Sequence, residues 1–153
     1  LKAAAKIEMT HVPYKGSGPA FIDLIAGQIQ VLFSSTVSSL PHVKSGKLHG
    51  LAITSLRRAQ ALPDVPTVAE SYPGFESSSW FGMLVPAKTP KLVIDRLLSE
   101  TRAALKSPDM NQTLISQGAE PGGQAPAEFA AYFQSEIKKW ARVIKEAGIR
   151  LDQ

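Results

Sequence analysis

Short apolar runs alternate with helical segments along the first third of the chain, and this alternation constrains the fold more than any other feature. Residues 7–12, 29–33 and 48–53 are strand candidates, and the second is apolar at nearly every position, as buried parallel strands are. The segments between them carry helical patterns that end at Gly27 and near Gly46. Strand, helix, strand, helix, strand with short links predicts an α/β fold with a parallel sheet.

The rest of the chain is predicted to be mostly helical. A short helix at 67–72 and an extended segment at 75–85 precede helices at 89–106 and 108–117. The longest helix is expected from Pro126 until Gly148 ends it. Its apolar side chains recur at helical spacing and are expected in the core: Phe129, Phe133, Ile137, Trp140 and Ile144.

Composition narrows the function classes. The chain has 153 residues, 44% of them hydrophobic, which suffices for one buried core. Its net charge of +4 comes from scattered residues, so a nucleic-acid partner is not indicated. The absence of cysteine excludes disulfides and thiol catalysis. No apolar run approaches the ~20 residues that span a bilayer.

The sequence offers little for catalysis. His11, His42 and His49 lack the spacing of a metal site, and no phosphate-binding loop, dinucleotide fingerprint or nucleophile elbow is present. We therefore expect no catalytic residue, no metal and no cofactor.

The glycine-rich loop between the first strand and the first helix is the main candidate for a binding site. It comprises Tyr14, Lys15, Gly16, Ser17, Gly18, Pro19 and Ala20. Glycines let a ligand approach the backbone closely, and the N–H groups at a helix start favour a carboxylate or phosphate. In open α/β sheets the ligand crevice lies beyond the carboxyl ends of the strands, where this loop is expected. The alternative is an ordinary connection with Lys15 in solvent.

Ser34, Ser35 and Thr36 occupy the equivalent position after the second strand. Their hydroxyls could cap the next helix, donate to a ligand oxygen, or do both. Together the two loops would present neutral donors to one crevice, which suits a molecule with one or two carboxylates.

A set of short segments runs in order across nearly the whole chain and resembles the Bug family, the solute-binding proteins of tripartite tricarboxylate transporters. Each segment is weak alone, and the ordered set is specific. The segments are residues 11–16, 19–20, 23–24, 27–28, 46–48, 51–55, 62–67, 69–70, 73–75, 80–82 and 145–149.

The resemblance implies the α/β fold of a type 2 periplasmic binding protein, in which two lobes close on a ligand. This chain would be a fragment, the C-terminal half, that covers part of both lobes. Residues 1–78 would be the remainder of one ligand-binding lobe. Residues 79–153 would be the crossover strand and the helical C-terminal part of the other lobe. A signal peptide and half of the ligand contacts are expected upstream.

The resemblance also implies a function. The chain would belong to a periplasmic protein, not an enzyme, that captures a small carboxylate and delivers it to membrane permease subunits. The loop from Tyr14 to Ala20 matches the family's ligand-contacting loop. Ser34 stands where many members carry an Asp that pairs with an amino group, so the expected ligand is a carboxylate without an α-amino group.

Other interpretations remain open from the sequence. A metabolite-sensing module of a regulator has a similar fold, and an α/β enzyme would need a catalytic base that the sequence does not reveal. The chain could also dimerise or exchange segments, and the extended segment 75–85 is the natural place for that exchange.

Overall fold

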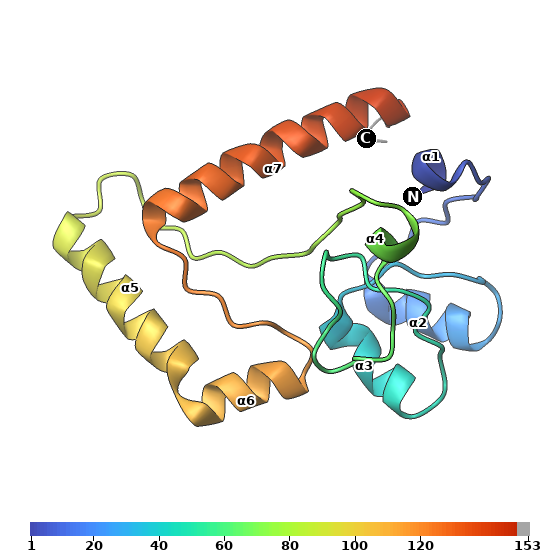
Figure 1. Ribbon diagram of the computed structural model, residues 1–153, viewed down its shortest axis with the longest axis horizontal. Coiled ribbons are helices and arrows are strands. Elements are labelled where there is room, and N and C mark those ends of the chain that lie inside the picture. Colours follow the sequence, from blue (N-terminus) through green and yellow to red (C-terminus); the bar gives the residue numbers. More distant parts are fainter. Residues whose placement is uncertain (150–153) are drawn as a thin grey trace. The chain divides into compact units, whose positions relative to one another are not determined.

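The computed structural model describes residues 1–149 and is mostly helical (Figure 1). Seven helices occur in this part of the chain: α1 (Lys2–Ala5), α2 (Ser17–Ile25), α3 (Thr36–Lys44), α4 (Val68–Ser71), α5 (Lys91–Lys106), α6 (Pro108–Ser116) and α7 (Pro126–Ala147). None of these helices is long and apolar enough to cross a membrane.

The helix ends follow the local signals in the sequence. Gly27 follows the last turn of α2 with a φ of 75°, and Gly148 closes α7 with a φ of 62°. Pro126 opens α7, and its missing N–H costs no hydrogen bond in a first turn. Thr67 and Glu70 form a capping box at the start of α4. These helix predictions are confirmed.

The expected strands do not pair with one another in the described residues. Within residues 1–149, a single parallel bridge joins Ile53 to Thr67, and residues 7–12 and 29–33 belong to no ladder. Apolar side chains in these runs are exposed as a result, by 55% at Phe33 and 70% at Leu51. A parallel strand is stable only between paired neighbours and covering helices, and residues 1–149 do not supply them. The predicted parallel sheet is therefore absent from this part of the chain.

The chain divides into two compact units. Unit 1 comprises Leu1–Leu84 and Ser107–Pro121, and unit 2 comprises Val85–Lys106 and the chain from Gly122 onward. The assignment of residues 1–78 and 79–153 to two ligand-binding lobes stays a prediction.

The core of unit 1 lies around α2 and α3. Its buried apolar side chains are Ala20, Phe21, Leu40, Ala59 and Val68. The rings of Phe21 in α2 and His42 in α3 have centroids 4.7 Å apart, so the two helices pack against each other. Gly118, just after α6, packs closely against Thr36 at the start of α3. A Cβ added to Gly118 would lie 2.8 Å from Thr36 Cγ2. This packing fixes the places where α2 and α3 begin.

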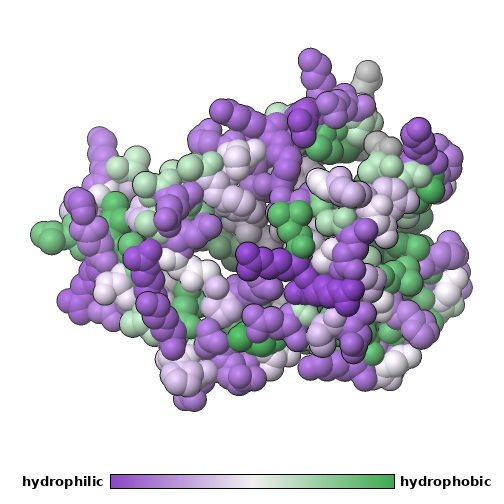
Figure 2. Space-filling model, in the orientation of Figure 1, coloured by the Kyte–Doolittle hydropathy of each residue, from purple (hydrophilic) through white to green (hydrophobic). Residues whose placement is uncertain are grey.

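Helix α7 of unit 2 makes both polar and aromatic contacts. The apolar stripe of α7, expected in the core, is only partly covered: Trp140 is 38% exposed and Ile137 49%. The buried residue of α7 is Glu136. Its carboxylate accepts a hydrogen bond of 3.0 Å from Trp140 Nε1 and forms an ion pair with Lys139. An amphipathic helix is buried only where another face covers it. The expectation of a buried stripe is thus wrong for the described residues, and Figure 2 shows exposed apolar side chains as green patches.

Candidate ligand-binding site

The start of α2 is an uncapped helix end. Gly16 precedes the helix with a φ of 113°, a conformation that glycine adopts at little cost. No side chain caps the helix, and its first turn contains no acidic residue. Pro19 brings no N–H of its own, so the N–H groups at this end belong to the residues just before it. The positive end of the helix dipole is therefore not neutralised by the chain itself.

The backbone at this helix start is also open. A Cβ added to Gly16 or Gly18 would meet nothing within 4 Å. Packing therefore does not require glycine at Gly18, and the absent side chain leaves the helix start accessible. Lys15 and Ser17 are exposed beside it. The loop thus combines free backbone donors, a nearby cation and room for a small anion.

Tyr14 and Asp23 join this loop to the body of α2. The Tyr14 hydroxyl donates a hydrogen bond of 2.7 Å to Asp23 Oδ2. This hydrogen bond, together with burial and the nearby negative charge, raises the pKa of the Tyr14 phenol, because each of them favours the protonated form. Asp23 was not among the residues expected at the site. No local pattern in the sequence indicates it, because the hydrogen bond joins residues that are 9 positions apart.

Ala20 differs from the other residues expected to contact the ligand. Its side chain is 2% exposed and belongs to the core of unit 1. A ligand at the start of α2 could therefore reach only its backbone. The expected contacts of Tyr14, Lys15, Gly16, Ser17, Gly18 and Ala20 with a ligand stay predictions.

The second expected loop divides into two different roles. Ser35 caps α3: its hydroxyl accepts from the Ser38 N–H at 3.3 Å and lies 2.9 Å from the Ser38 hydroxyl. Ser34 is exposed, and its hydroxyl makes only a long contact of 3.5 Å with the Ser35 carbonyl. Ser34 is consequently the better donor to a ligand, whereas Ser35 is committed to the helix.

The two loops belong to the same unit, on helices that are packed together. The contact between Phe21 and His42 joins α2 to α3, which lie next to each other in Figure 1. Among the described residues, no hydrogen bond links the loop at 14–20 to the loop at 34–36. A single crevice shared by both loops stays a prediction.

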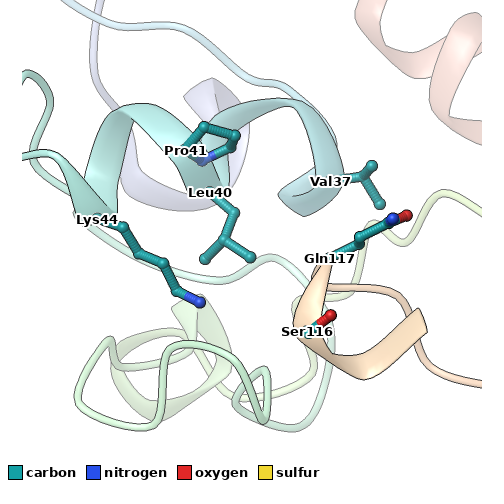
Figure 3. A pocket seen from close by; sticks show the side chains of 6 residues that line it. All are labelled: Val37, Leu40, Pro41, Lys44, Ser116 and Gln117. Atoms are coloured by element: carbon teal, nitrogen blue, oxygen red, sulfur yellow. The ribbon is translucent and has the colours of Figure 1, made fainter. Parts of the chain in front are cut away.

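A hollow elsewhere in unit 1 was not anticipated from the sequence. It has a volume of 270 Å³ and lies between α3 and the end of α6 (Figure 3). Its walls are Val37, Leu40, Pro41, Lys44, Ser116 and Gln117. Ligand pockets are usually larger than about 300 Å³ and contain several converging polar groups. The hollow shares no residue with the two loops and does not extend the candidate site.

The described residues contain no group of three or more His, Cys, Asp or Glu side chains that could hold a metal ion. The candidate site therefore consists of backbone donors, hydroxyls and one lysine. Such a site is typical of proteins that bind a small organic anion.

The comparisons with known proteins identify the family. Residues 1–149 match the tripartite tricarboxylate transporter family receptor, TctC, and the chain belongs to this family. Protein BugT of Bordetella pertussis is 38% identical over 152 residues, which cover 99% of this chain and 46% of BugT.

Solved structures agree with this assignment. R. palustris Rpa4515 with adipate has a TM-score of 0.87 at 36% identity and is matched over 97% of this chain and 50% of its own. MatC from Rhodopseudomonas palustris with bound malate has a TM-score of 0.79 at 31% identity, over 94% of this chain and 50% of its own. The chain thus spans about half the length of these relatives. The resemblance to the Bug family and the fold class, that of a periplasmic binding protein present in part, are confirmed.

Proposed function

We propose that the chain is part of an extracytoplasmic solute-binding protein that captures a small carboxylate. The observation that carries this proposal is the open start of α2, with Gly16 at a positive φ of 113° and no acid or side-chain cap in the first turn. Such a helix start replaces the water around a carboxylate with backbone donors. Membership of the receptor family and the adipate and malate bound by two relatives support the same ligand class.

The ligand is a dicarboxylate without an α-amino group. Burying an ammonium requires a carboxylate partner, and Ser34 offers only a neutral hydroxyl. The first turns of α2 and α3 contain no acidic residue either. The uncapped start of α2 therefore favours a negative group on the ligand, and neither helix start supplies a carboxylate partner for an ammonium.

The proposal includes a role in transport and not in catalysis. The loaded protein acts in the periplasm and passes its ligand to membrane permease subunits, which select the ligand-bound form by its higher affinity. The chain spans about half the length of BugT and of Rpa4515, so further ligand contacts come from the part that it does not span. Association between two chains through the exposed residues Phe81 and Leu84 is a further element of the proposal.

Amide NMR of the chain tests the proposal, because it detects binding even at millimolar affinity. Adipate and malate are titrated separately, and aspartate serves as the matched amino-acid control. We expect both dicarboxylates to shift the amide signals of Ser17 and Gly18, whereas aspartate leaves them in place. Shifts with aspartate but not with the dicarboxylates would contradict the choice of ligand, and no shift with any acid would contradict the function.

A further inference from the structure

Residues 10–16 are tied to the rest of unit 1 by a single side-chain hydrogen bond in the described structure, that of Tyr14 with Asp23. The two residues are 9 positions apart, and the bond of 2.7 Å is between a part-buried phenol and a carboxylate. Apart from the bonds of α2 itself, these loop residues make no backbone hydrogen bond to other segments among residues 1–149. The position of the loop thus depends strongly on this one bond.

The loop itself has little intrinsic rigidity. Gly16, at the end of the loop, gives the backbone conformational freedom, and its Cβ position has no neighbour within 4 Å. A loop with such freedom loses conformational entropy when it orders around a ligand. A contact that orders the loop before binding removes part of this cost.

We infer that Asp23 is a positioning residue of the ligand loop and acts through Tyr14. This inference rests on the proposed function. Asp23 is the seventh residue of α2 and lies about 9 Å along the helix from Ser17, at 1.5 Å per residue. Its carboxylate is too far along the helix to cap the first turn, and its charge would repel an anion at close range. Its contribution is to hold the Tyr14 side chain, and with it the backbone of Lys15 and Gly16, over the helix start.

The chemistry of the pair suits this role over the working pH range. The pKa of Tyr14 is raised mainly by the hydrogen bond to Asp23, so the phenol remains a donor at neutral and mildly alkaline pH. A hydrogen bond to a charged acceptor is also stronger than one between neutral groups. The phenol therefore keeps the proton that it donates to Asp23 over this pH range.

Two other roles of the pair are possible and predict different results. Tyr14 could contact the ligand directly, in which case Asp23 would matter little for affinity. The bond could also stabilise the fold without affecting the loop's readiness to bind. A double-mutant cycle on ligand affinity, combined with thermal unfolding, separates both alternatives from positioning.

The experiment measures the dissociation constant for adipate at pH 7 by amide NMR in the chain and in Tyr14→Phe, Asp23→Ala and the double variant. Tyr14→Phe is nearly isosteric and is expected to fold. Asp23→Asn is the conservative variant, because its amide oxygen still accepts from the phenol. Asp95→Ala is the control, because it removes an exposed acid of α5 that pairs only with Lys91.

We expect each single variant and the double variant to weaken adipate binding by the same factor, about five-fold for one hydrogen bond. Asp23→Asn restores affinity to within about two-fold, since it keeps the bond. Asp95→Ala leaves affinity unchanged, and the unfolding midpoints of the loop variants do not follow the loss of affinity.

The opposite results overturn the inference. If Asp23→Ala leaves the affinity for adipate unchanged while Tyr14→Phe weakens it, Tyr14 contacts the ligand directly. If the unfolding midpoints of the variants fall while their affinity for adipate is unchanged, the pair contributes to stability alone. Additive losses in the double variant also exclude action through Tyr14. If the parent chain does not bind adipate at all, the proposed function fails and the positioning role fails with it, a result distinct from the other three.

Discussion

The guanidinium of Arg58 holds the carboxylate of Glu70 through two hydrogen bonds, 2.9 Å from Nε and 2.7 Å from Nη2. Its remaining nitrogen donates to the Pro63 carbonyl at 3.1 Å. Glu70 also accepts from the Thr67 N–H at 2.9 Å, within the capping box of α4. These bonds close the loop between Arg58 and Glu70 and support the parallel bridge between Ile53 and Thr67.

The Arg58–Glu70 pair predicts a specific pH dependence. The hydrogen bond from Arg58, and next the one from the Thr67 N–H, lower the pKa of Glu70 from 4.5 to about 2. Because the folded-state pKa is below the unfolded one, the stabilisation is complete above about pH 4.5 and is lost as the pH falls toward 2. Both side chains are nearly half exposed, so the effect is modest and weakens with added salt.

Thermal unfolding of the chain and of Glu70→Gln checks this prediction. We expect the chain to have the higher midpoint at pH 7 and the two midpoints to converge between pH 4.5 and pH 2. The two proteins share every other carboxylate, so the difference between their midpoints reports the titration of Glu70 alone. An unchanged difference between the midpoints at pH 7 and pH 2 would show that Glu70 is not the titrating group.

Gly118→Ala is predicted to destabilise unit 1 more than Gly74→Ala. Both glycines have a φ of 84°, so both variants place alanine in the left-handed region and share that cost. Only at position 118 does the new Cβ clash, at 2.8 Å from Thr36 Cγ2. We expect Gly118→Ala to lower the free energy of unfolding by about 1–3 kcal/mol more than Gly74→Ala. Chemical denaturation measures both, and equal losses would place α6 away from Thr36.

The sequence was sufficient to predict structure wherever the cause is local. Pro126, Gly148 and the capping box at Thr67 mark helix ends because the signal and its effect lie within one turn. Strand pairing is different, because it depends on distant partners. The run at 29–33 has the composition of a buried parallel strand, but no strand in the described residues pairs with it.

The candidate site shows the same division. The glycine-rich loop and the serines after the second run were recognised as helix starts from their residue types alone. Composition did not separate Ser34 from Ser35, since only the backbone conformation decides which hydroxyl points at the Ser38 N–H. The bond from Tyr14 to Asp23 spans 9 residues and depends on how the intervening loop turns, which no local pattern encodes.

Ser34→Ala and Ser35→Ala are predicted to have opposite consequences. Ser35 caps α3, so its loss lowers the free energy of unfolding by about 1 kcal/mol. Ser34 is exposed and makes only a long contact, so its loss changes stability by less than about 0.5 kcal/mol. By contrast, Ser34→Ala weakens adipate binding, because it removes the Ser34 hydroxyl that can donate to a ligand. Denaturation and amide NMR titration measure the two quantities, and a Ser34→Ala variant with unchanged affinity would remove Ser34 from the site.

Gly18→Leu is predicted to abolish binding without loss of stability. A Cβ at this position meets nothing within 4 Å, and leucine replaces a glycine inside α2 by a good helix former, so we expect α2 to form at least as well. The same side chain would cover the open start of α2 and occupy the space of the bound carboxylate.

Gly122→Leu is the matched control: it also has open space around its Cβ position and lies in the segment before α7. Amide NMR titration with adipate should show binding in Gly122→Leu and none in Gly18→Leu, while both keep the unfolding midpoint of the parent. Equal affinity in the two variants would contradict binding of the ligand at the start of α2.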